Sequence, residues 1–390
     1  MYFPMSLTLD RIKIGNSFFG YSDMKKLWAV SLLFLNASVS AQAPSFAMMT
    51  GGLYASATHK TSHAPAETVR ELIPNAGRLP PDIAAQAKAL SGSNQRIALA
   101  LIEKGEVVFK HRADTVTDTT LIPSFSMAKS LTSTMLGYAL CDGKIKDLND
   151  KVAQYVPELS ETAYGKSSIK NILQMASGAN SSGQNGEPHT GFSTQLRDHK
   201  ISQLESLLKF KDPQTRLFKK VEPGDGFDYK NLDTATLSFV IEKATGQPFH
   251  KWYEATLVKN AGLQHPTGWL LDKDQRAIAH AYFFAAQDDW IRLAMHSLDL
   301  LKGKAGTCMQ AYMTKATQDR IRVTSNSQFN EYGYQFWSGI PGLRKDTFWK
   351  AGFGGQFIGI DPTTERIVVV SSTDWSTQAF SLLQNWANKN

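Results

Sequence analysis

Two β-rich groups of segments, one near each end of the chain, enclose a long stretch of helical pattern. The first, RIALALIEKGEVVFKHR, predicts strands at Arg96–Ile102 and Glu106–His111 that form a hairpin through a turn at Lys104-Gly105. The second, GGQFIGIDPTTERIVVVSS, predicts strands near Gln356–Ile360 and Arg366–Ser372. Because helical patterns dominate between the two groups, we expect strands from both ends to form one sheet around an inserted helical part.

The fold class that this layout predicts is α+β, with an antiparallel sheet built from both chain ends, flanked by helices, and an inserted mainly helical domain. Glu331–Gly339 adds a strand, and an amphipathic helix at about Gln378–Asn388 closes the chain. Clefts between such parts are common binding sites. The expected parts are a lead-in segment at 42–95 with a short helix near Asp82–Leu90, a sheet domain at 96–125 and 325–390, and a helical domain at 126–324.

The N-terminal region, residues 1–41, has the pattern of a secretory signal preceded by an extension. MKKLWAVSLLFLNASVSAQA begins at Met24 with two lysines, continues through an apolar run from Leu27 to Leu35, and ends in small residues. The apolar run is too short to span a bilayer, and the small residues favour cleavage after Ala41. The sequence therefore predicts an exported protein, periplasmic or secreted, without an integral membrane span.

Charge and composition argue against several classes of function. The net charge is +7, but the basic residues are scattered and no nucleic-acid recognition motif accompanies them, so a solvated basic face is expected rather than a nucleic-acid partner. The nine histidines are dispersed, and neither C-x-x-C nor H-E-x-x-H occurs. No metal and no cofactor is expected. The two cysteines, Cys141 and Cys308, either pair in an oxidising compartment or remain as two buried thiols.

Ser126 and Lys129 stand three residues apart at the expected start of a helix, in SFSMAKSLTSTMLGYALCDGKI. One interpretation is an ordinary helix start, with the serine as N-cap and the lysine in solvent. Lysine in the first turn, however, has the wrong sign for the helix dipole, and residues three apart share a helix face. In apolar surroundings such a lysine can take the proton of the adjacent hydroxyl.

Two further motifs follow along the chain. Tyr229-Lys230-Asn231 comes after a Pro223-Gly224 turn and before a helix, where a phenol and an amide could carry a proton and hold a substrate. Lys350-Ala351-Gly352 stands at the opening of a strand, where a cation and a glycine-rich edge could hold a carboxylate or carbonyl. Each motif alone has low specificity, whereas the order S-x-x-K, Y-x-N, K-x-G is specific.

With these motifs the sequence resembles the serine β-lactamase and penicillin-binding superfamily. Within it, the chain is similar to class C-like serine hydrolases related to 6-aminohexanoate-dimer hydrolase and to esterases of β-lactamase fold. The resemblance extends from about Arg96 to the end and implies a β-lactamase/transpeptidase-like fold. Its supporting phrases are GKIKDLNDKVAQYVPEL, ILQMASGANSSG, YKNLDTATLSFVIEKATGQ and GFGGQFIGIDP.

The resemblance also implies roles for individual residues, which are as follows: Ser126 is the nucleophile, Lys129 its base, Tyr229 the proton carrier to the leaving group, Asn231 a neighbour of the acyl chain, Lys350 and Gly352 cleft-lining residues, and the backbone N–H groups of Ser126 and Phe353 the oxyanion hole. Two positions depart from the family pattern. Ala351 replaces a threonine whose hydroxyl often helps to hold a β-lactam carboxylate, which argues against efficient β-lactamase activity. Lys230 replaces a small residue.

The sequence therefore predicts a secreted serine hydrolase that cleaves a small-molecule amide or ester through an acyl-enzyme on Ser126. The alternative is a penicillin-binding-like sensor or scaffold that acylates without turnover. The segment Gly178–Gln195 is expected to be a loop at the mouth of the cleft, where loops commonly set specificity. His189 within it is interpreted as a surface histidine.

Overall fold

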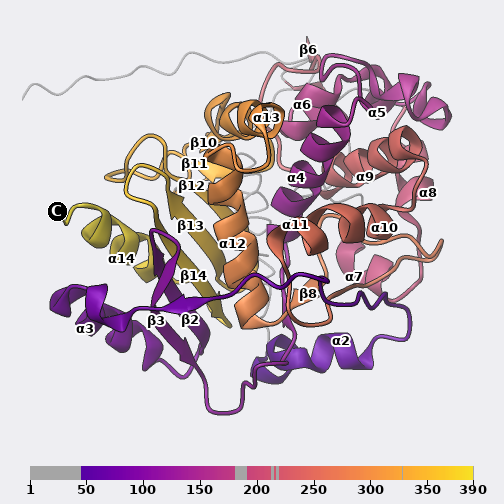
Figure 1. Cartoon of the computed structure of the whole chain (residues 1–390). Coiled ribbons are helices and arrows are strands. Elements are labelled where there is room, and N and C mark those ends of the chain that lie inside the picture. The colour runs from indigo at the N-terminus through magenta and orange to yellow at the C-terminus, as the bar shows by residue number, and fades with distance from the viewer. Residues whose placement is uncertain (1–44, 181–190, 212–214, 217–218, 327, 390) are drawn as a thin grey trace, which may run out of the picture. The chain divides into compact units, whose positions relative to one another are not determined.

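The computed structural model describes residues 45–180, 191–211, 215–216, 219–326 and 328–389 (Figure 1). The leader expected at residues 1–41, and His189, lie outside this set. Among the helices that are described, none combines the length and the apolar character needed to cross a bilayer.

A nine-stranded sheet joins segments from both ends of the described chain. Strands from the two ends meet in an antiparallel pair that places Val368 opposite Leu101. This confirms the predicted sheet built from both ends, and among the described strands β1 differs in running parallel to its neighbour. In spatial order the strands are β1 (Ile73–Pro74), β3 (Glu106–Arg112), β2 (Arg96–Glu103), β14 (Arg366–Ser372), β13 (Gln356–Asp361), β12 (Phe348–Gly352), β11 (Trp337–Ser338), β10 (Glu331–Tyr332) and β9 (Ile321–Arg322).

The sheet differs from the expectation in two places. It takes in β1 and β9, which lie outside the ranges 96–125 and 325–390. The single strand expected at Glu331–Gly339 is instead a hairpin of β10 and β11. Its turn includes Gln335, which has a φ of +66° and is held in the interior by hydrogen bonds to Leu173 and from Ser130. These tertiary contacts, which local sequence does not encode, bend the segment back on itself.

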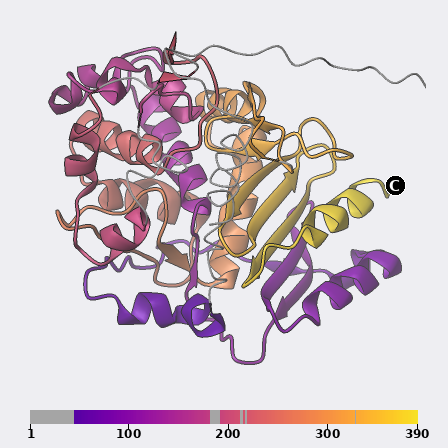
Figure 2. The ribbon, with the colours of Figure 1, turned by 180° about the vertical axis from the view of Figure 1, so that it is seen from behind.

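Helices cover both faces of the sheet (Figures 1 and 2). Helices α3 (Pro81–Ser91) and α14 (Gln378–Ala387) pack on one face, and α4 (Met127–Cys141) and α12 (Gln287–Leu301) pack on the other. Alternate residues of β12 and β14 therefore enter two different apolar clusters. Because both faces are covered, the central strands read as nearly continuous apolar runs rather than as an alternating pattern.

The segment between β4 and β9 is mostly helical, as expected. Its helix α4 packs against α9 and α13. The remaining helices are α2 (Leu53–Ser56), α5 (Ala163–Lys166), α6 (Ile169–Leu173), α7 (Phe192–Arg197), α8 (Gln203–Leu208), α9 (Asn231–Thr245), α10 (Phe249–Tyr253), α11 (Lys259–Ala261) and α13 (Thr307–Gln318). The small sheets are β4 (Ile122–Pro123), β8 (Phe283–Ala285) and β7 (Gly268–Trp269), and β5 (Thr215–Arg216) with β6 (Lys219–Lys220).

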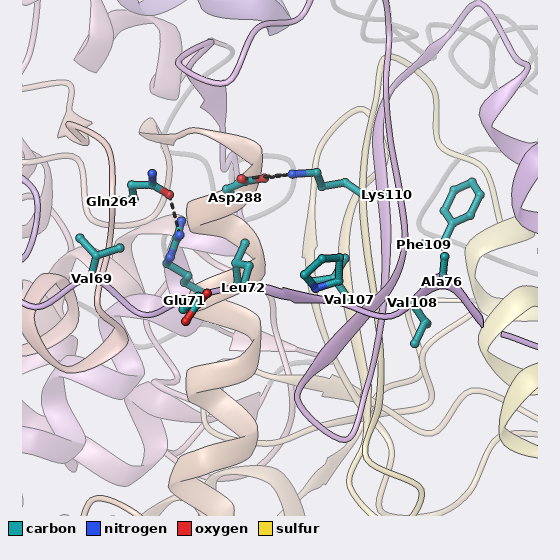
Figure 3. Close-up of a pocket in the computed structure, with 12 residues that line it drawn as sticks. Val69, Glu71, Leu72, Ala76, Val107, Val108, Phe109, Lys110, Gln264 and Asp288 are labelled. Carbon is teal, nitrogen blue, oxygen red and sulfur yellow. Dashed lines mark hydrogen bonds and ion pairs between the residues drawn. The ribbon is translucent and has the colours of Figure 1, made fainter. Parts of the chain in front are cut away.

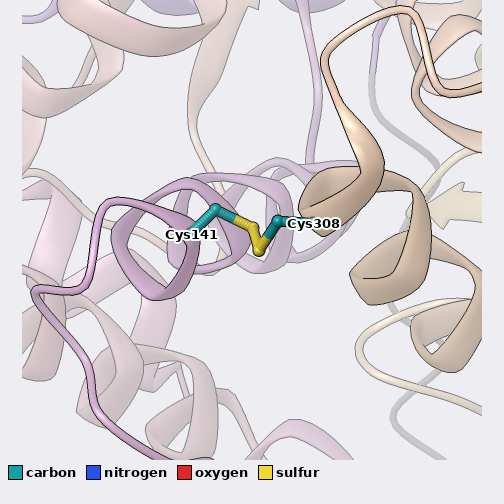
Figure 4. Close-up of a disulfide and its surroundings, with 2 residues drawn as sticks. All are labelled: Cys141 and Cys308. Carbon is teal, nitrogen blue, oxygen red and sulfur yellow. A yellow bond between two sulfur atoms is a disulfide. The ribbon is translucent and has the colours of Figure 1, made fainter.

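The two cysteines form a disulfide that links the last residue of α4 to the start of α13 (Figure 4). The helices also fit closely beside this bond: a Cβ at Gly137 would lie 2.4 Å from the ring of Tyr312. The Tyr312 hydroxyl donates to the Ser133 carbonyl at 2.8 Å. The sequence left open whether the two cysteines pair or remain as buried thiols, and the structure shows that they pair.

Replacing Cys141 and Cys308 together with serine is expected to lower the free energy of unfolding by about 2–4 kcal/mol. The cross-link closes a long loop, and its loss frees the unfolded chain. Urea unfolding of the double variant, compared with the parent protein with and without reductant, measures the difference. An unchanged midpoint in all three samples would contradict a stabilising role for the bond.

Candidate active site

Ser126 lies directly before α4, in a segment held by the small sheet. Ser124 exchanges hydrogen bonds with Phe283 of β8: its N–H donates to the Phe283 carbonyl at 2.7 Å, and its hydroxyl accepts from the Phe283 N–H at 3.1 Å. Phe125 follows with a φ of +39°, which is unusual for a residue with a side chain. This bend presents Ser126 at the helix N-terminus, half-buried.

The side chain of Ser126 does not act as a helix cap. Ser126 occupies the N-cap position with helical backbone angles, and its hydroxyl accepts no backbone N–H of α4. Instead, Lys129 Nζ donates to Ser126 Oγ at 2.9 Å. The lysine is also not in solvent, since it is only 1% exposed. Both parts of the interpretation as an ordinary helix start, a capping serine and a solvated lysine, therefore do not hold.

Lys129 is surrounded by acceptors that suit a proton-carrying amine. Besides Ser126 Oγ, its Nζ donates to Asn231 Oδ1 at 2.7 Å and to the His280 carbonyl at 3.0 Å. Both of these oxygens can only accept. In the ammonium form, the third N–H of Lys129 points to Ser126 Oγ, which is the contact found. In the neutral form, the two remaining N–H donors would serve these two oxygens and the lone pair would face the Ser126 hydroxyl.

The Tyr-Lys-Asn motif places its outer residues beside Lys129 and its middle residue elsewhere. The ring of Tyr229 lies 4.9 Å from Lys129 Nζ and stacks on Trp337, with centroids 5.4 Å apart. Asn231 begins α9. Lys230 is fully buried, and its ammonium lies 3.1 Å from a carboxylate oxygen of Asp228. The long cation that departs from the family pattern is thus part of a buried ion pair.

Two backbone N–H groups are available near Ser126. A Cβ at Gly352 would lie 2.3 Å from the Ser124 carbonyl and 3.3 Å from the Met127 nitrogen, so only glycine lets the end of β12 approach α4 this closely. Among the described residues, neither the Ser126 N–H nor the adjoining Phe353 N–H donates a hydrogen bond. The helix N-terminus adds positive potential at the same place.

The remaining motif residues face away from this group. Lys350 is 1% exposed, and its ammonium donates to Ser297 Oγ of α12 at 2.8 Å. Burial lowers the pKa of Lys350 to about 7. Ala351 points to the opposite face of β12 and packs in the apolar cluster under α14, where a threonine hydroxyl would be surrounded by apolar side chains. The structure thus brings together Ser126, Lys129, Tyr229 and Asn231, but not the Lys350 ammonium.

Two polar residues at the site are not among the site residues predicted from the sequence. One of them, Ser193, falls in the segment Gly178–Gln195, which the sequence predicts to be a loop, but it lies in helix α7. His280 contributes its carbonyl to Lys129, and its imidazole Nε2 lies 3.2 Å from Ser193 Oγ. No motif marks either residue, and a carbonyl contact can come from any residue type. Within the part of the chain that is described, no group of three metal-ligating side chains occurs.

A pocket of about 520 Å³ lies along the outer edge of the sheet (Figure 3). It is bounded by β3, by the segment that includes Glu71 and Leu72, and by the first turn of α12. An ion pair between Lys110 and Asp288, at 3.0 Å, lies at its rim. None of the predicted site residues lines this pocket.

Comparison with known proteins identifies relatives with the same architecture. A family model described as beta-lactamase matches residues 83–389. A beta-lactamase of Pseudomonas fluorescens is 26% identical over 43% of this chain and 44% of its own length. A 6-aminohexanoate-dimer hydrolase of Paenarthrobacter ureafaciens is 23% identical over 64% of this chain and 65% of its own. The chain thus spans less than two thirds of the length of either relative.

Solved structures share the fold at low sequence identity. A Bacillus anthracis protein provisionally named 6-aminohexanoate-dimer hydrolase superimposes with a TM-score of 0.68 and 18% identity, over 88% of this chain and 96% of that one. A class C beta-lactamase variant gives a TM-score of 0.54 and 17% identity, over 78% and 97%.

Proposed function

The chain belongs to the beta-lactamase family, and we propose that it is a serine hydrolase that cleaves an amide or an ester through an acyl-enzyme on Ser126. The observation that carries the proposal is the contact between Lys129 Nζ and Ser126 Oγ at 2.9 Å, with the serine hydroxyl engaged in no helix cap. A nucleophile within hydrogen-bond distance of its base is the arrangement that covalent catalysis requires.

In the proposed acylation step, the Ser126 hydroxyl proton moves to the neutral amine of Lys129 while Oγ bonds to the substrate carbonyl carbon. The carbonyl oxygen becomes an oxyanion, which accepts from the N–H groups of Ser126 and Phe353. The leaving group then departs with a proton delivered through Tyr229, whose ring lies against Lys129. Asn231 keeps Lys129 in place and lies beside the acyl chain.

Deacylation repeats these steps with water as the nucleophile. The neutral amine of Lys129 takes one proton from the water while the water oxygen bonds to the acyl carbon; the bond between this carbon and Ser126 Oγ then breaks, and Oγ receives the proton from Lys129 directly or through Tyr229. The backbone at Gly352 would border the substrate, because its close contact with Ser124 places the end of β12 at this point.

The substrate class that we propose is a neutral ester or linear amide rather than a β-lactam. A β-lactam carries a carboxylate, and the cation that the family pattern offers for it, Lys350, donates to Ser297 instead. Ala351 supplies no hydroxyl. An ester or linear amide that lacks the carboxylate of a β-lactam needs neither the Lys350 ammonium nor a hydroxyl at position 351.

Short-chain p-nitrophenyl esters are therefore expected to be hydrolysed with a higher kcat/KM than penicillins or cephalosporins, and Ser126→Ala is expected to abolish the activity. Steady-state assays measure the order of the kcat/KM values for four substrates: p-nitrophenyl butyrate, a chromogenic cephalosporin, a D-Ala-D-Ala peptide and a linear aminohexanoate dimer. Faster turnover of the cephalosporin would contradict the proposed substrate class. Labelling of Ser126 without turnover of any substrate would favour a sensor that only acylates.

We also propose export, on the signal pattern at Met24–Ala41. The protein recovered outside the cytoplasm is expected to begin near Gln42. N-terminal sequencing of that fraction measures the processing site, and an intact N-terminus that retains residues before Met24 would contradict this pathway.

A further inference from the structure

The hydrogen bonds of Lys129 continue beyond the predicted site residues. Asn231, whose Oδ1 accepts from Lys129, directs its Nδ2 toward Ser193 Oγ at 3.4 Å. Ser193 Oγ in turn lies 3.2 Å from His280 Nε2. The His280 side chain is 1% exposed, and its Nδ1 has no partner among the described residues. Each group in this row can therefore donate to the next, and the row ends at a buried imidazole.

Two elements fix the positions of Ser193 and His280. His280 lies in the turn that precedes β8, and Thr132 of α4 holds this turn by donating to the Ala279 carbonyl at 2.9 Å. On the other side, Phe192 at the start of α7 stacks on the imidazole with the ring planes 16° apart. Ser193 is the next residue of α7, so stacking of Phe192 brings its hydroxyl to the imidazole.

We propose that Ser193 and His280 form a positioning pair that fixes the orientation of the Asn231 amide and, through it, the hydrogen bonds of Lys129. This inference rests on the proposed role of Lys129 as the base. A neutral imidazole either accepts the Ser193 O–H at Nε2 or donates its Nε2–H to Ser193 Oγ, and in both tautomers a lone pair of Ser193 Oγ is left for the amide N–H of Asn231. The amide then keeps its carbonyl toward Lys129.

Burial and the electrostatics of the site support a neutral ring. Burial holds the pKa of His280 well below its ordinary value, and the charge of Lys129 in its ammonium form lowers it further. The opposite orientation of the Asn231 amide would set N–H donors against the amine of Lys129, which needs acceptors. Loss of the pair would remove one contact that favours the orientation with the carbonyl toward Lys129.

Loss of the Ser193–His280 pair is expected to lower the rate of the acylation step. The Asn231 carbonyl oxygen would hold an N–H of Lys129 less firmly, so the lone pair of the neutral amine would face the Ser126 hydroxyl less often. Ser193 and His280 act through Asn231 and are positioning residues. Substrate binding should therefore change little.

Ser193→Ala is expected to lower the single-turnover acylation rate with p-nitrophenyl butyrate roughly tenfold, the usual effect of one hydrogen bond, while the substrate concentration that half-saturates this rate stays within about twofold. Ser193→Thr keeps the hydroxyl and is expected to recover most of the rate. The matched control is Ser206→Ala, because the Ser206 hydroxyl is buried in α8 and, among the described residues, donates to the carbonyl of the N-cap Ser202 at 2.8 Å rather than to any site residue. This control should acylate at the parent rate.

The second arm varies the imidazole. His280→Gln keeps a polar atom near the position of Nε2 and should retain more of the rate than His280→Leu. Because the two residues act in one row, Ser193→Ala combined with His280→Leu should be no slower than the slower single variant. Multiplied effects, unchanged rates in Ser193→Ala, or failure of threonine to recover the rate would overturn the inference. Activity that survives in Ser126→Ala would instead overturn the proposed function.

Discussion

Lys129→Met is expected to lower the acylation rate by about 100- to 10,000-fold, the range typical of a general base. Methionine fills a similar volume but can neither take the Ser126 proton nor donate to Asn231 and the His280 carbonyl. Stopped-flow release of p-nitrophenol in the first turnover measures the effect directly. Circular dichroism and the thermal midpoint establish that the variant remains folded.

The control is Lys144→Met, which makes the same exchange at an exposed position after the end of α4. It should acylate at the parent rate. If Lys129→Met also acylated at near the parent rate, Lys129 would be a buried structural lysine, and a different base would have to activate Ser126.

The second large effect concerns stability. Lys350→Met is expected to raise the free energy of unfolding by roughly 4 kcal/mol at pH 6–7. Burial lowers the pKa of Lys350 from 10.5 to about 7, and each pKa unit corresponds to about 1.36 kcal/mol, from which the lost hydrogen bond to Ser297 subtracts about 1 kcal/mol. Below pH 7 the lysine is charged in both the folded and the unfolded state, so the full cost of burying the charge is present.

The same shift predicts a dependence on pH. Between pH 7 and about 10.5 the folded protein releases a proton that the unfolded chain keeps, so the parent gains stability as pH rises. Lys350→Met should remove this gain. Urea unfolding of both proteins at pH 6, 8 and 9.5 measures this gain. If the free energy of unfolding depended on pH in the same way in both proteins, Lys350 would not be a buried charge without an acidic partner.

Lys230→Met is expected to change the free energy of unfolding in the opposite direction from Lys350→Met. Lys230 is as deeply buried as Lys350, but its ammonium has the Asp228 carboxylate at 3.1 Å. Removing it breaks a charge-assisted contact and should destabilise the protein by roughly 1–3 kcal/mol. If both variants changed the free energy of unfolding in the same direction, an acidic partner would not explain how the two lysines differ.

The features that the sequence predicted correctly depend on local patterns. The hairpin of β2 and β3 and the strands β13 and β14 follow from β-branched runs separated by turn residues. The contact between Ser126 and Lys129 follows from helical spacing alone. Tyr229 and Asn231 lie beside Lys129 because residues two apart in an extended segment point the same way, which also explains why Lys230 points elsewhere.

The features that the sequence did not predict depend on packing between distant elements. The direction of Lys350 is set by which face of β12 meets α12, and strand alternation does not decide that. The pairing of Cys141 with Cys308 requires α13 to lie beside the end of α4. Ser193 and His280 come together because the start of α7 meets the turn that precedes β8, and neither residue lies in a recognisable motif.

The pairing of β2 with β14 has a consequence for synthesis of the chain. Leu101 leaves the ribosome long before its partner Val368, so the strand pair that joins the two ends of the sheet can form only when translation is nearly complete. The same holds for the two N–H groups proposed to bind the oxyanion, one early in the chain at Ser126 and one late at Phe353. A nascent chain that stops before β12 would carry the nucleophile and its base without half of the oxyanion hole. Labelling of Ser126 by an acylating probe would then report that the C-terminal strands have been made and have docked.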